Sequence, residues 1–97
     1  MTKLDNQVAL VTGAGSGIGE AIAIGFANIG AKVVCADKNL EGAENTANTI
    51  LANSGSALAI KADVSSPSDC KNQVKATVEK FGSIDILVNN AGVGFHR

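Results

Sequence analysis

Two hydrophobic spacings alternate along the chain. Short, largely apolar runs predict strands at 8–12, 32–37, 57–62 and 84–88, because a strand buried on both faces of a parallel sheet has little need of polar positions. Between these runs, apolar residues recur every three or four positions, which is the spacing of one face of a helix. The pattern therefore predicts strands and helices in alternation.

Residues typical of helix ends bound the first two predicted helices. The first helix spans 17–29, and Gly30 follows at a position where a left-handed residue often ends a helix. The second helix carries its apolar stripe over 40–51 and ends near 53–55. Both helices are long enough to cross the face of a sheet.

The third predicted helix has the clearest start. Ser66 can cap it, Pro67 suits the first helical position, and Asp69 can reach back as in a capping box. Gly82 is expected to end it. The apolar positions predicted to form its buried face are Cys70, Val74, Val78 and Phe81.

The alternation predicts an α/β fold in which helices cover a parallel sheet. In a Rossmann-type doubly wound sheet, right-handed crossovers place strands two and three on one side of strand one. The fourth strand returns to the other side, which gives the strand order 3-2-1-4. Residues 13–19 and 89–94, which follow strands one and four, then meet at the edge where such sheets bind ligands.

Glycines gather directly after the first predicted strand. Gly13, Gly17 and Gly19 have the spacing G-x-x-x-G-x-G, with Gly15 between them, rather than the more common G-x-G-x-x-G. Glycine permits a sharp turn and a close approach of the backbone to an anion, and a helix that starts there directs N–H groups toward it. The stretch predicts the diphosphate loop of a dinucleotide site. The alternative is a tight turn that binds no ligand.

Asp37 ends the second predicted strand, 18 residues after Gly19. Dinucleotide sites place an acid about 20 residues beyond the glycines, where it accepts hydrogen bonds from ribose hydroxyls. Such an acid repels the 2′-phosphate of NADP and so favours NAD, although Lys38 beside it weakens the preference. The alternative for Asp37 is a solvated carboxylate at a strand end.

Two further strand ends carry polar residues at the same edge. The Asp63 carboxylate can accept from an adenine amino group and the Val64 N–H can donate to a ring nitrogen, but an Asx-type turn is the alternative for Asp63. Asn89 and Asn90 follow the fourth strand, where the two-sided hydrogen bonding of asparagine suits the joining of strand ends. A purely structural role for Asn89 stays open.

Composition narrows the possible partners. The net charge is −1 and no basic cluster is present, so neither nucleic acid nor an anionic membrane surface is an expected partner. No apolar run is long enough to span a bilayer, and residues 1–7 lack the apolar core of a signal peptide. Cys35 and Cys70 are far apart and are interpreted as reduced core residues, not metal ligands. We therefore expect a cytoplasmic protein without a metal site.

Three ordered motifs resemble those of the short-chain dehydrogenase/reductase family. The stretch 12–19 is similar to its T-G-x-x-x-G-I-G loop, 63–64 to its adenine-site pair, and 87–92 to its N-N-A-G motif. The resemblance implies the amino-terminal, cofactor-binding half of an NAD(P)-dependent alcohol/ketone oxidoreductase. The cofactor-binding residues that it implies, together with the spacings above, are Gly13, Ser16, Gly17, Ile18, Gly19, Asp37, Asp63, Val64, Asn90, Ala91 and Gly92.

The catalytic residues of that family have no counterpart in the sequence. The family uses a Tyr-x-x-x-Lys pair with a serine, and this chain contains no tyrosine. Its sole histidine, His96, is not expected to act as a catalyst. We therefore expect residues 1–97 to form an incomplete half-domain that is inactive alone, within a longer chain or a homo-oligomer. The alternative is a short, non-catalytic nucleotide-binding or interaction module.

Overall fold

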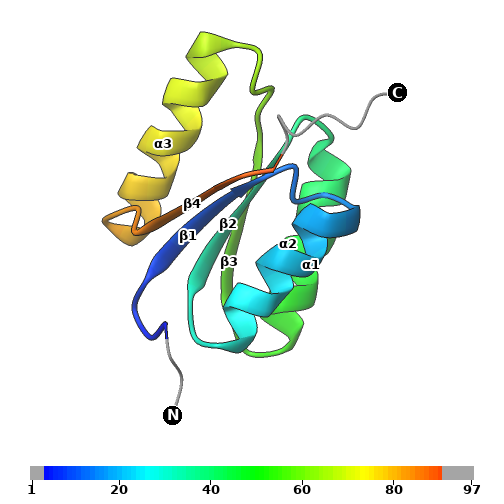
Figure 1. Cartoon of the computed structure of the whole chain (residues 1–97), viewed down its shortest axis with the longest axis vertical. Coiled ribbons are helices and arrows are strands. Elements are labelled where there is room, and N and C mark those ends of the chain that lie inside the picture. The colour runs from blue at the N-terminus through cyan, green and yellow to red at the C-terminus, as the bar shows by residue number, and fades with distance from the viewer. Residues whose placement is uncertain (1–3, 91–97) are drawn as a thin grey trace.

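A computed structural model describes residues 4–90 of the chain. Strands and helices alternate as predicted (Figure 1). The elements are β1 (Val8–Thr12), α1 (Gly17–Asn28), β2 (Lys32–Asp37), α2 (Leu40–Ala52), β3 (Ser56–Lys61), α3 (Pro67–Phe81) and β4 (Ile86–Asn89).

The four strands form one parallel sheet in the order β3-β2-β1-β4, which confirms the predicted topology. In the register of the sheet, Val11 of β1 lies between Cys35 of β2 and Val88 of β4. Figure 1 shows α1 and α2 on one side of the sheet and α3 on the other. This is the arrangement that right-handed crossovers dictate when the chain reverses direction across the sheet after β3.

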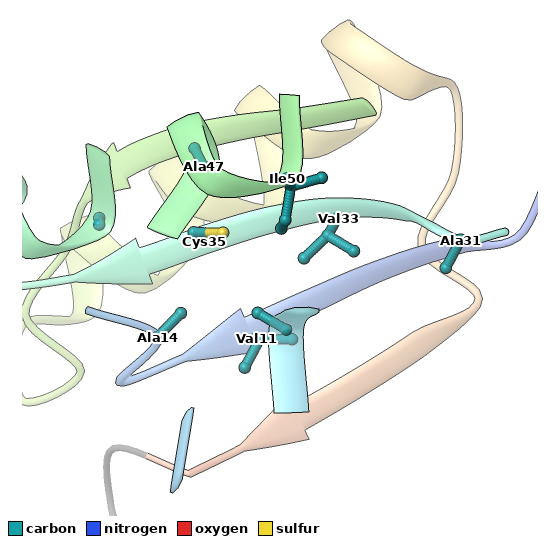
Figure 2. Packing of buried hydrophobic residues seen from close by; sticks show 9 residues of the cluster. Val11, Ala14, Ala31, Val33, Cys35, Ala47 and Ile50 are labelled. Atoms are coloured by element: carbon teal, nitrogen blue, oxygen red, sulfur yellow. The ribbon is translucent and has the colours of Figure 1, made fainter. Parts of the chain in front are cut away.

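The larger apolar core lies between the sheet and helices α1 and α2. Figure 2 shows Ala47 and Ile50 of α2 packed beside Val33 and Cys35 of β2. The helices contribute alanines at several of these positions, so their backbones approach the sheet closely. Each fully buried aliphatic side chain, such as Val33, stabilises the fold by about 1.5–3 kcal/mol relative to its exposed state.

The predicted helix ends are confirmed. Gly30 has a φ of 102° and Gly82 a φ of 92°, so both end their helices in the left-handed region that favours glycine. Ser66 caps α3, because its Oγ accepts a hydrogen bond from the Asp69 N–H. The predicted capping box is wrong in its second half, because the Asp69 carboxylate accepts from the Asp63 N–H at 2.9 Å and the Ser66 N–H donates to the Asp63 carbonyl instead.

The fourth strand begins two residues later than predicted, at Ile86. Asp85 explains the difference, because its carboxylate takes the place of a backbone acceptor at the start of the β1–β4 ladder. The Val8 N–H donates to Asp85 Oδ2 at 2.8 Å, while the Asp85 N–H donates to the Val8 carbonyl at 2.9 Å. The apolar run therefore starts before regular strand pairing does.

The predicted buried face of α3 is wrong in part. Val74 and Val78 are 44% and 43% exposed, whereas the buried positions are Gln73 and Thr77. The other two predicted positions, Cys70 and Phe81, are half-buried. The valines lie one helical position beyond the buried pair, on a side of α3 that the described residues leave largely open. Apolar spacing locates an apolar stripe, but it does not identify what packs against it.

Candidate functional site

The carboxyl ends of all four strands border one cleft at a single edge of the sheet. Its volume is about 300 Å³. Six of the eight lining residues are ones that the sequence assigned to a cofactor site, and the other two are Lys38 and Ala62. The full lining consists of Gly13, Ser16, Asp37, Lys38, Ala62, Asp63, Val64 and Asn90.

The glycine loop between β1 and α1 depends on its glycines for shape. Gly13 and Gly17 have φ values of 66° and 59°, in the left-handed region that other residues rarely adopt. A Cβ on Gly19 would collide with the Gly13 carbonyl oxygen and would stand 2.7 Å from Asn90 Nδ2. The first turn of α1 is therefore in direct contact with the start of the loop, and only glycine fits there.

The N-terminus of α1 has the properties of an anion site. Ser16 occupies the N-cap position in an extended conformation, but its side chain makes no capping hydrogen bond. The N–H groups of Gly17, Ile18 and Gly19 belong to the first turn and so have no acceptor within the helix. These donors, together with the positive end of the helix dipole, favour a negatively charged group beside Ser16.

The Asp37 carboxylate joins the end of β2 to the glycine loop. Its Oδ2 accepts a hydrogen bond from the Gly15 N–H at 2.8 Å, and its Oδ1 accepts one from the Asn39 N–H at 2.9 Å. Asp37 is therefore half-buried and held in place, which differs from a freely solvated strand-end carboxylate. Because each carboxylate oxygen can accept more than one donor, both retain capacity for a ligand hydroxyl.

Asp63 forms the Asx-type turn that was the alternative interpretation of this residue. Its Oδ1 accepts hydrogen bonds from Ser65 Oγ at 2.7 Å and from the Ser65 N–H at 2.9 Å. These hydrogen bonds lower the pKa of the Asp63 carboxyl, and the charge of Lys38 lowers it further. Asp63 consequently carries a negative charge at neutral pH at the rim of the cleft.

Asn89 at the end of β4 and Asn90 directly after it connect β4 to β1. Thr12 Oγ1 lies 3.3 Å from both Asn89 Oδ1 and the Val88 carbonyl oxygen, and Asn90 Nδ2 donates to the Gly13 carbonyl at 3.4 Å. Asn89 thus acts between strands, while Asn90 contacts the glycine loop and lines the cleft. The predicted residues Ala91 and Gly92 lie outside the described part of the chain.

Sequence reasoning missed residues of α2 that support the glycine loop from behind. Thr46 Oγ1 donates to the Ala14 carbonyl at 2.7 Å, and Gly42 packs so closely that a Cβ on it would lie 2.9 Å from the Gly15 carbonyl oxygen. The signal for Thr46 was a hydroxyl within the apolar stripe of 40–51, because a buried hydroxyl needs a partner. Its partner is 32 residues away and could not be read from spacing.

Two other classes of feature are absent from residues 4–90. No three histidine, cysteine, aspartate or glutamate side chains there come together as a metal site would require. No helix in this range has the length and apolar character needed to cross a bilayer. The cleft itself presents backbone N–H groups, two carboxylates, a serine hydroxyl, an amide and a lysine.

Comparison with known proteins identifies the family. The model of the short chain dehydrogenase family matches residues 7–97. The chain belongs to that family. The motifs at 12–19, 63–64 and 87–92, which resemble those of short-chain dehydrogenases, all lie within the matched segment.

Individual short-chain dehydrogenases are similar to this chain over nearly all of its length. The cyclohexanol dehydrogenase of Acinetobacter sp. (strain SE19) is 45% identical over 91 residues, which cover 94% of this chain and 36% of that protein. The 3-ketoacyl-(acyl-carrier-protein) reductase of Brucella melitensis, solved in complex with NADH, superposes with a TM-score of 0.87 at 52% identity. That match covers 95% of this chain and 37% of the reductase.

A third relative was solved with both cofactor and steroid. It is a 7 alpha-hydroxysteroid dehydrogenase complexed with NADH and 7-oxo glycochenodeoxycholic acid, with a TM-score of 0.88 at 40% identity. The match covers 90% of this chain and 34% of that enzyme. The chain thus spans little more than a third of the length of the relatives that it matches.

Proposed function

We propose that residues 1–97 form the dinucleotide-binding half-domain of an NAD-dependent short-chain dehydrogenase. The observation that carries the proposal is the convergence of four separate strand ends on one cleft beside the N-terminus of α1. NADH in the solved structures of two similar short-chain dehydrogenases supports the same ligand class.

The cleft residues would hold three parts of the cofactor, namely the diphosphate, the adenosine ribose and the adenine. Ser16 and the N–H groups of Gly17, Ile18 and Gly19 would hold the diphosphate, because they form the positive end of α1. Asp37 would accept from the hydroxyls of the adenosine ribose. Asp63 and Val64 would hold adenine, and the segment from Asn90 through Ala91 to Gly92 would pass beside the cofactor.

The electrostatics of the cleft favour NAD over NADP. Asp37 stands where the 2′-phosphate of NADP would approach, and its negative charge would repel that group. Lys38 lines the same cleft and opposes this preference. Asp63, whose pKa is lowered, adds a second negative charge at the rim. The excess of carboxylate over ammonium charge at the cleft supports the proposal that NAD is the preferred ligand.

The reaction proposed for the full-length protein is hydride transfer between a nicotinamide and a carbonyl or hydroxyl substrate. The nicotinamide, when bound, supplies or accepts the hydride. Residues 1–97 would bind and orient the cofactor without supplying the acid that protonates the substrate oxygen, because they contain no tyrosine. Those residues therefore bind NAD but are expected to be inactive alone.

Calorimetric titration with NAD tests the proposal, and two glycines of α1 provide matched variants. Gly19→Ala places a methyl group against the Gly13 carbonyl and Asn90, so NAD affinity should fall by more than about tenfold. Gly25→Ala, where a Cβ meets nothing within 4 Å, should bind NAD as the wild type does. Absence of binding at millimolar NAD in the wild type would overturn the proposal.

A further inference from the structure

One peptide group of the glycine loop, the unit that joins Ala14 to Gly15, is held at both ends. Its carbonyl accepts a hydrogen bond from Thr46 Oγ1 at 2.7 Å, and its N–H donates to Asp37 Oδ2 at 2.8 Å. The preceding Ala14 N–H donates to the Ala36 carbonyl at 3.1 Å. Hydrogen bonds from β2 and α2 therefore fix the orientation of this peptide plane.

Thr46 differs from the other threonines in helices. Thr49 and Thr77 direct their hydroxyls to the carbonyl four residues earlier in their own helices, at 3.1 and 2.7 Å. Thr46 has the equivalent contact with Gly42 only at 3.2 Å, and its shorter hydrogen bond leaves the helix for Ala14. Since a hydroxyl carries a single proton, the loop carbonyl is its principal acceptor.

The environment of Thr46 strengthens this contact. The side chain is fully buried, at 0% exposure, and does not line the cleft. Loss of the hydroxyl would leave the Ala14 carbonyl buried without its side-chain donor, and an unsatisfied buried acceptor is unfavourable. Gly42, one turn earlier, allows α2 to approach the loop closely enough for the contact.

From this geometry we infer that Thr46 is a positioning residue for the ribose and diphosphate subsites, which it does not touch. By holding the Ala14 carbonyl, Thr46 keeps the Gly15 N–H directed at Asp37. The N–H in turn holds the Asp37 carboxylate toward the loop, where the proposed ribose hydroxyls would bind. The inference rests on the proposed NAD site and adds that α2 sets the cofactor preference through one hydroxyl.

The test compares NAD and NADP affinity in three variants of the same chain by calorimetry. Thr46→Val keeps the shape but removes the hydroxyl, and should weaken NAD binding about fivefold while weakening NADP binding less. Thr46→Ser should restore both affinities to within about twofold of wild type. Thr77→Val changes an equally buried threonine on the opposite face of the sheet, and it should leave the ratio of NAD affinity to NADP affinity unchanged.

Each outcome decides a separate point. If the wild type binds no NAD, the proposed function fails. If the wild type binds NAD and folded Thr46→Val keeps the same affinity and the same NAD-to-NADP ratio, the role of Thr46 fails. Amide hydrogen exchange of Gly15 in the wild type is a second measurement that does not require the variant to fold. Slow exchange supports the held peptide, and exchange at the rate of an exposed loop amide contradicts it.

Discussion

At the scale of single residues, Asp37 has two functions that substitutions can separate. Its carboxylate braces Gly15 and is the proposed acceptor for the ribose hydroxyls. We expect Asp37→Ala to weaken NAD binding by about tenfold or more, since hydrogen bonds to charged groups contribute about 1.5–3 kcal/mol. NADP binding should fall less, because removal of the negative charge also relieves repulsion of the 2′-phosphate.

Calorimetry with both cofactors measures this effect. Glu79→Ala removes an exposed acid from α3 and serves as the control, with both affinities expected to stay at wild-type values. Equal losses of NAD and NADP affinity in Asp37→Ala would contradict the proposed hydrogen bonds from Asp37 to the ribose hydroxyls. Asp37 would then act only by holding the glycine loop in place.

The buried thiol of Cys35 should make the free energy of unfolding depend on pH in the alkaline range. Burial raises the pKa of its thiol from 9.0 to about 12. The stability that the neutral thiol contributes is therefore complete below about pH 9 and is lost as the pH rises toward 12. At about pH 10.5 this one group should have lowered the free energy of unfolding by about 2 kcal/mol relative to neutral pH.

Urea unfolding at neutral and alkaline pH, with Cys35→Ala as the comparison, measures this contribution. The variant should lose about 2 kcal/mol less than the wild type between the two conditions. An identical alkaline loss in the wild type and Cys35→Ala would contradict the assignment.

The site residues that the sequence could predict are those whose residue type is required by the local backbone or by their position in a strand. Gly13 and Gly17 stand where a sharp turn demands positive φ, and Asp37 ends a strand at a fixed distance from them. The hydroxyl of Thr46 within an apolar stripe indicates that it needs a buried partner, but Ala14 could not be predicted as that partner, because the contact exists only after α2 has packed against the loop. Local demands identify a residue in the sequence, whereas the partner of a packing contact does not follow from spacing.

At the scale of the elements, the start of α3 is specified by its own side chains. Ser66 accepts from the Asp69 N–H, and Asp69 holds the Asp63 N–H, so the cap and the preceding turn are linked. We expect Ser66→Ala to lower the free energy of unfolding by about 1 kcal/mol. Asn72→Ala, at an exposed interior position of the same helix, should change it by less than about 0.5 kcal/mol.

Urea denaturation of the two variants measures both effects. A loss in Ser66→Ala no larger than that in Asn72→Ala would show that the cap contributes nothing to stability. The comparison separates the capping hydrogen bond from the general tolerance of α3 to alanine.

Element order and helix ends could be predicted because they depend on neighbours in the sequence. Gly30 and Gly82 ended their helices as expected. The buried face of α3 could not be predicted correctly, because Val74 and Val78 have helical spacing but lie beside the sheet-facing positions Gln73 and Thr77. The helical spacing of these valines does not indicate which surface packs against them.

At the scale of the whole molecule, one face of the sheet is incompletely covered. Val74 and Leu87 are 44% and 61% exposed and line a hollow of about 250 Å³, and Val78 on the same helix as Val74 is 43% exposed. Gln73, only 6% exposed, borders the same hollow, and its Oε1 has no hydrogen-bond partner within the described range. An apolar surface with an unsatisfied acceptor is typical of a surface that another segment covers.

We therefore expect the 97-residue chain to self-associate or to be marginally stable in isolation. Sedimentation velocity over a range of concentrations should show association that Leu87→Gln reduces. Leu51→Gln, which changes a leucine of similar exposure on α2, should not reduce it. A monomer at every concentration, with a cooperative thermal transition, would contradict this expectation.

The topology and the location of the cleft could be predicted because they follow from chirality and alternation. The order β3-β2-β1-β4 brings the glycine loop next to Asn90, which is separated from Gly13 by 77 residues. What covers the open side of α3 and β4 could not be predicted, because the relatives are nearly three times as long as the segment they share with this chain.

The central claim is that NAD binds where the four strand ends meet, and amide chemical-shift mapping tests it most directly. Titration of the isotope-labelled chain with NAD should shift the amides of Gly17, Ile18 and Gly19 and those near Asp37 and Val64. The amides of α3 beyond its first turn should stay unchanged. Saturable shifts confined to the α3–β4 face, or no shifts at millimolar NAD, would contradict the account.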